Sequence, residues 1–145
     1  MFGLEDIMKK VDLGDILEKV GLSDSEKKEV TNQAANAVKY RTTKETARGN
    51  KGVMANLFSQ NDNTTEANQV AKKMEGDLAF NLKKNTNLST SVIDQVKSAV
   101  MSKFLGGMST TAKEKGDKDG AGMLDSFMDN DMMDGFKSKL GSFFK

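Results

Sequence analysis

The side chains that could do chemistry in this chain are carboxylates, amines and hydroxyls, because its 145 residues include no His and no Cys. Without Cys there is no thiolate nucleophile and no Cys-type zinc site, and without His the commonest general base and metal ligand is missing. Tyr40 is the single tyrosine. No phosphate-binding loop, dinucleotide fingerprint or nucleophile elbow occurs. The composition therefore predicts a protein that is not an enzyme and that uses neither a cofactor nor a metal.

One acidic stretch has part of the spacing of a calcium loop. Counted as position one of an EF-hand loop, Asp117 places Asp119 at position three and Asp125 at position nine. Ala121 stands at position five, and Met128 stands where the bidentate Glu of position twelve belongs. We interpret residues 117–125 as a solvated turn before a helix, with a weak cation site as the alternative.

A basic stretch over residues 27–51 is the second candidate. Its cations outnumber Glu29 and Glu45, and the chain as a whole has a net charge of +1. A solvated helix face is the first interpretation, and a nucleic-acid-binding module, with phosphate contacts beside Tyr40, is the alternative. The residues proposed for that alternative are Lys39, Arg41, Lys44 and Arg48.

The C-terminal segment carries the strongest apolar pattern. Large apolar residues recur there every four positions from Leu124 to Phe144, which predicts one apolar face along a helix. Met and Phe make adaptable contact surfaces, so this face is either core or a surface for self-association. Acids precede bases along the segment, which suits the helix dipole better than a lipid surface. The predicted interaction surface comprises Phe127, Met128, Met132, Phe136, Leu140, Phe143 and Phe144.

The elements that would position these residues are all helical. Apolar residues recur at spacings of three and four, and the chain contains no Pro, so we expect an all-α bundle of six or seven helices. Ser23 and Glu26 form a capping box that opens a helix to about residue 46, after Gly21 ends the one before. Further helices are predicted over 53–58, 66–84 with a cap at Asn63, 89–105 and 122–144. Residues 109–120 are expected to form a polar loop.

The helices repeat in order. Residues 21–58 and 87–128 form two similar capped-helix units, in which Val30 corresponds to Val96 and Val38 to Phe104 at an offset of 66. Residues 1–20 precede them as an N-terminal amphipathic segment, with Asp12 as a predicted cap. The domain organisation expected is therefore this segment followed by a helical domain over residues 21–145, made of the two units and the C-terminal helix.

This arrangement of Gly-Leu-Ser caps, Gly-opened apolar helices and a C-terminus rich in Gly, Phe and Leu resembles the YidB-like bacterial family of unknown function. The resemblance covers residues 20–144. It implies a small helical fold related in shape to homeodomains, and it supplies no catalytic residue.

The sequence as a whole favours a structural or protein-interaction role. We expect a non-catalytic protein that associates with itself, as a homo-oligomer, or with another protein through apolar helix faces. Nucleic acid and membrane surfaces are not the expected partners. No apolar run approaches the ~18 residues of a membrane span, and residues 1–10 lack the pattern of a signal peptide, so the expected compartment is the cytoplasm.

Overall fold

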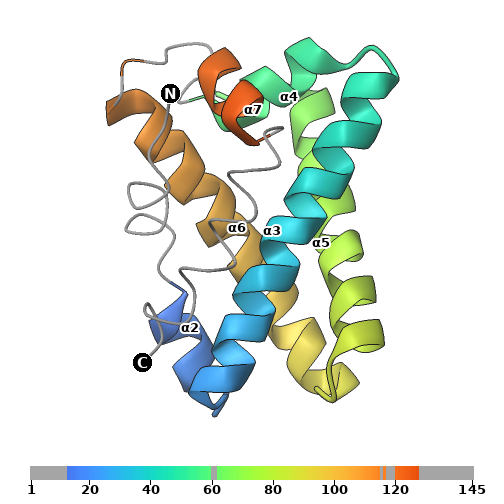
Figure 1. The fold of residues 1–145 in the computed structure, drawn as a ribbon, viewed down its shortest axis with the longest axis vertical. Helices are drawn as coiled ribbons and strands as arrows, with labels where there is room; N and C mark the ends of the chain where they lie inside the picture. Colours follow the sequence, from blue (N-terminus) through green and yellow to red (C-terminus); the bar gives the residue numbers. More distant parts are fainter. Residues whose placement is uncertain (1–12, 60–61, 115, 117–119, 128–145) are drawn as a thin grey trace.

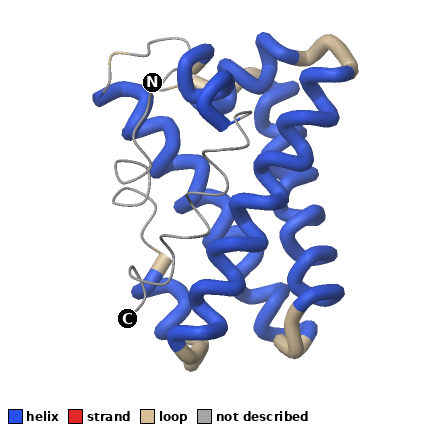
Figure 2. The backbone as a smooth tube through the Cα atoms, in the orientation of Figure 1, coloured by secondary structure: helices blue, strands red, loops and turns tan. Residues whose placement is uncertain are grey.

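A computed structural model describes residues 13–59, 62–114, 116 and 120–127 of the chain. Within these ranges every regular element is a helix and no strand occurs, as Figure 2 shows. The expected all-α fold is thereby confirmed. The helices are α2 (Gly14–Lys19), α3 (Asp24–Ala47), α4 (Lys51–Phe58), α5 (Thr65–Asn85), α6 (Thr90–Glu114) and α7 (Ala121–Phe127).

Three long helices form the body of the molecule. α5 packs against α3 and against α6. In Figure 1, α3 and α5 run along the long axis, and α6 runs obliquely from lower right to upper left. The short helices α4 and α7 pack together at one end of this body, and α2 packs against α6 near the other end. All six helices contribute buried apolar side chains to a single core. Its largest fully buried side chains are Phe58, Phe104, Leu13, Leu17, Met54, Met74, Leu78, Leu82 and Met101.

The start of α3 follows its local sequence. The backbone N–H of Glu26 donates to the Ser23 hydroxyl over 3.2 Å, and the Ser23 N–H donates to the Glu26 carboxylate over 2.9 Å. Both halves of the predicted capping box are therefore present. Gly21 has a φ of 78°, a conformation that glycine adopts without steric cost, and it ends the turn after α2 as predicted.

One predicted cap differs in the structure, and another lies outside the described residues. Thr64, not Asn63, caps α5 by accepting a hydrogen bond from the N–H of Ala67 over 3.2 Å. The Asn63 side chain donates to Asn68 instead. Leu13 occupies the N-cap of α2 without a side-chain hydrogen bond, and Asp12 lies outside the described residues.

Helix α6 is longer than predicted. It runs through Gly106 and Gly107 to Glu114, so the expectation of an end near 105 and a polar loop from 109 was wrong for residues 106–114. Thr111 and Ala112 are buried in this part, and the Thr111 hydroxyl donates to the Gly107 carbonyl over 2.9 Å. Tertiary burial there outweighs the low helix propensity of two glycines. A Cβ added at Gly76 in α5 would meet no neighbouring atom, so this glycine does not mark a close crossing of two helices.

α6 and α7 begin at similar offsets from α3 and α4, and the internal repeat itself stays a prediction. α6 begins 66 residues after α3, and α7 begins 70 residues after α4. Val30 and Val96 are both buried, as are Val38 and Phe104. A common origin of the units 21–58 and 87–128 stays a prediction. The N-terminal segment is part of the same packed body where it is described, because Leu13 and Leu17 are fully buried in the core.

At Gly120 the backbone before α7 comes close to α4. Gly120 has a φ of 80°, and a Cβ at this position would overlap the carbonyl oxygen of Ala55 in α4. The backbone before α7 therefore approaches α4 as closely as only glycine allows.

Among the helices in the described ranges, none is long and apolar enough to cross a bilayer.

Candidate binding groove between α3 and α5

The predicted C-terminal interaction surface falls almost wholly outside the described residues. Phe127 is the last residue of α7, and residues 128–145, with Met128, Met132, Phe136, Leu140, Phe143 and Phe144, lie beyond it. Leu124, the first residue of the apolar face, is buried in the core. The predicted turn at 117–125 is described only from residue 120, so Asp117 and Asp119 lie outside the described residues.

The predicted basic residues lie on α3, but its arginines are engaged with acids. Arg41 donates through Nε and Nη2 to the two carboxylate oxygens of Asp77 in α5, each over 2.9 Å. Arg48 pairs with Glu45 over 3.2 Å. Lys44 lies beside the ring of Tyr40, and Lys39 is half-buried on the same helix. The four cations therefore do not form one row of open phosphate ligands.

The ion pairs around Arg41 join α3 to α5. Glu45 is 2% exposed and lies 3.8 Å from Arg41. The hydrogen bond to Asp77 raises the pKa of Arg41 and outweighs the opposing effect of burial. Burial raises the pKa of Glu45, but the hydrogen bond from Asn50 and the charges of Lys73, Arg48 and Arg41 together lower it. Both groups are therefore held in their charged forms.

A groove runs along this junction and has an unusual lining. It has a volume of about 410 Å³ and is lined by Gln33, Asn36, Tyr40, Asp77, Phe80, Asn81 and Asn85, which we call the α3–α5 groove. Tyr40 is 53% exposed and Phe80 is 65% exposed, and they are the large apolar side chains that the described residues leave in solvent. Because both line one groove, the exposed aromatic surface of the described part is concentrated there.

Amide side chains fill the rest of the groove. Asn85 donates to the Gln33 amide oxygen over 3.3 Å, and the Gln33 nitrogen donates to Glu29 over 2.7 Å. Asn36 and Asn81 are half-buried, and neither side chain makes a hydrogen bond within the described part of the chain. Each offers one carbonyl acceptor and an NH₂ donor to a ligand.

Cations lie over the two exposed rings. Nζ of Lys44 is 5.6 Å from the centre of the Tyr40 ring, and Nζ of Lys84 is 6.0 Å from that of Phe80. Both distances fall within cation–π range. Neither lysine has a carboxylate within ion-pair distance among the described residues, whereas Asp77 is neutralised by Arg41. The aromatic rim therefore carries an excess of positive charge.

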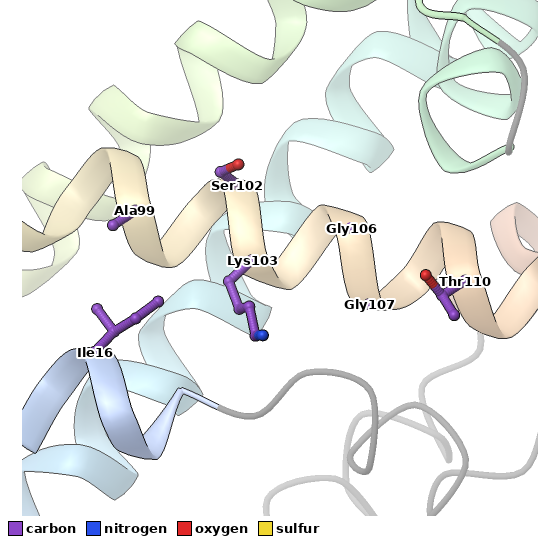
Figure 3. A pocket seen from close by; sticks show the side chains of 7 residues that line it. All are labelled: Ile16, Ala99, Ser102, Lys103, Gly106, Gly107 and Thr110. Atoms are coloured by element: carbon purple, nitrogen blue, oxygen red, sulfur yellow. The ribbon is translucent and has the colours of Figure 1, made fainter.

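A second hollow lies on the other side of the molecule, between α2 and α6. Figure 3 shows Ile16 of α2 facing Ala99 and Lys103 of α6, with two glycines of α6 in the floor. Its volume is about 470 Å³, but the side chains present no titratable group other than Lys103. In the described ranges no three acidic residues come together where a metal could bind. The α3–α5 groove is the better candidate site, because it is lined by the two exposed aromatic rings and by amide side chains.

Sequence reasoning identified Tyr40 but missed Phe80 and the amides. Phe80 is two positions from both Leu78 and Leu82, which are fully buried, and so lies on the opposite side of α5. The signal in the sequence was that Phe80, a large apolar residue, lies outside the apolar face of its helix. Phe80 and Tyr40 line the same groove only because α3 packs against α5, and no short motif encodes that packing.

Comparison with known protein families, with curated proteins and with solved structures gives no match at a significant level.

Proposed function

We propose that this chain is a non-catalytic protein-interaction protein that associates with copies of itself and uses the α3–α5 groove as a contact surface. The observation that carries the proposal is the exposure of Tyr40 and Phe80 in one groove. Aromatic side chains are enriched at the centres of protein interfaces, where they bury a large apolar area at a low cost in side-chain entropy.

The half-buried amides support a peptide-like partner. Asn36 and Asn81 each present a donor and an acceptor, which match the N–H and C=O groups of another chain. An interface of this kind gains apolar area from the rings and specificity from the amides. The apolar C-terminal surface, from Phe127 to Phe144, is proposed as the complementary contact.

Nucleic-acid binding is the weaker candidate on these contacts. Arg41 and Arg48 are the residues best suited to grip a phosphate with two hydrogen bonds, but both are paired with acids. Binding to phosphates would have to break those pairs. We also propose a relation to the YidB-like family and a cytoplasmic location. Both rest on the sequence patterns described above.

The test is the molar mass of the full chain, measured by light scattering behind a sizing column at two protein concentrations. The wild type should exceed the mass of one chain and rise with concentration. The double variant Tyr40→Ser with Phe80→Ser should keep the mass of one chain at both concentrations. A matched control is Lys72→Ser with Lys103→Ser, at exposed positions of α5 and α6 that do not line the α3–α5 groove.

Circular dichroism should show the same helix content in all three proteins, so that a change in mass is not caused by unfolding. A wild type with the mass of one chain at both concentrations contradicts the proposal. So does a double variant that associates as strongly as the control.

A further inference from the structure

We propose that the α3–α5 groove binds residues 128–136 of a second copy of this chain. This inference rests on the proposed function, and it names the partner segment. The chain continues for 18 residues after α7. The first of these residues combine the two properties that the groove would select, namely large apolar side chains and negative charge.

The charges of the two surfaces are complementary. Lys44 and Lys84 lie over the exposed rings without an acidic partner in the described part of the chain. Between Met128 and Phe136 the sequence carries three carboxylates and no Lys or Arg. These carboxylates are Asp129, Asp131 and Asp134. Opposite charges at a rim speed association and select the register of binding.

The apolar residues of the segment suit the aromatic floor. Met128, Met132 and Phe136 recur every four residues, which places them on one face if the segment is helical. Met side chains contact aromatic rings favourably and adapt to irregular surfaces. In a helix the distance from Met128 to Phe136 is about 12 Å, and the distance along α3 from Gln33 to Tyr40 is about 10 Å. The segment therefore has the length of the groove.

The last described helix, α7, does not line the groove. α7 packs against α4 and α6, whereas the groove opens between α3 and α5. Figure 1 shows α7 close to α4 at one end of the bundle. A second copy is the occupant that follows from the proposed self-association, and the mixing experiment below distinguishes it from contact within one chain.

A charge exchange in the full chain tests this inference. The groove variant is Lys44→Glu with Lys84→Glu, and the segment variant is Asp131→Lys with Asp134→Lys. Each variant alone brings like charges together, so each should associate at least about tenfold more weakly than the wild type in 0.1 M salt. An equimolar mixture restores opposite charges at both contacts of a reciprocal dimer. The mixture should therefore recover the mass of the wild type at the same total concentration.

The control is Lys72→Glu with Asp94→Lys, which alters two exposed charges on other parts of α5 and α6 and should leave association unchanged. If the wild type associates but the groove and segment variants associate equally well, the inference is overturned and the proposed function stands. If both variants are weakened but the mixture does not recover, binding in trans is overturned, since contact within one chain cannot be restored by mixing. A monomeric wild type overturns both.

Discussion

The ion pair between Arg41 and Asp77 predicts a large loss of stability when one partner alone is removed. Two N–H groups of Arg41 reach the two oxygens of Asp77 at 2.9 Å, and the side chains are 11% and 17% exposed. The substitution Asp77→Asn leaves a guanidinium that is largely shielded from water. Its remaining acidic partner in the described part is Glu45, at 3.8 Å. An uncompensated charge in such a place is costly.

The size of the loss follows from the geometry. Removing one partner of a fully buried pair typically costs about 3–5 kcal/mol. Glu45 still offsets part of the charge of Arg41, and both side chains keep some contact with water. We therefore expect Asp77→Asn to lower the free energy of unfolding by about 2–3 kcal/mol, which corresponds to a fall in Tm of about 5–10 °C for a chain of this length.

The assay is urea unfolding followed by circular dichroism, with a double-mutant cycle of Arg41→Leu and Asp77→Leu. The double variant should lose less stability than the sum of the two single variants. Each single variant leaves one charge of the pair without its partner, whereas the double variant removes both charges. Asp94→Asn is the matched control, since Asp94 pairs with Lys97 over 3.7 Å at an exposed site. It should cost less than about 1 kcal/mol. Equal effects of Asp77→Asn and Asp94→Asn, or a coupling near zero, would refute this reasoning.

Three further predictions concern single sites. Gly120→Ala should lower the free energy of unfolding more than Gly116→Ala. Both positions have a positive φ, but only at Gly120 would a Cβ overlap α4. Equal losses of stability in urea unfolding would contradict this. Ser23→Ala should cost about 1 kcal/mol through loss of the capping box, and an unchanged Tm would argue against the cap. Because the pKa of Glu45 is lowered by folding, its contribution is present above the pKa of an unfolded glutamate, about 4.3, and is lost as the pH falls through the folded pKa. Glu45→Gln should therefore reduce the loss of stability between pH 5 and pH 3, and an unchanged slope would exclude Glu45 as its source.

Two local features of the fold were predicted correctly, whereas the cap of α5 was predicted at Asn63 and lies at Thr64. The capping box at Ser23 and the turn at Gly21 involve residues within three positions of each other, so their signals can be read directly. The apolar spacing that places Leu78 and Leu82 in the core is also local to α5. These signals are sufficient for an all-α bundle and for the order of its long helices.

The errors arose where tertiary contacts outweigh local preference. Gly106 and Gly107 read as a helix end, but α6 continues because Met108, Thr111 and Ala112 are buried beyond them. The candidate groove was missed for a related reason. Its aromatic residues are 40 positions apart, and the packing of α3 on α5 that joins them involves the Arg41–Asp77 pair. The composition shows that Tyr40 is the single tyrosine, but it does not show which side chains line a groove with it.

The most direct test of the central claim is the quenching of Tyr40 fluorescence as a function of protein concentration. Tyr40 is the only tyrosine and the chain has no Trp, so its emission reports on the α3–α5 groove alone. If copies associate through this groove, the quenching constant for acrylamide should fall as the mass rises above that of one chain, since the exposed ring becomes covered. A mass that rises while the quenching of Tyr40 stays constant would contradict the assignment of the groove as the contact surface.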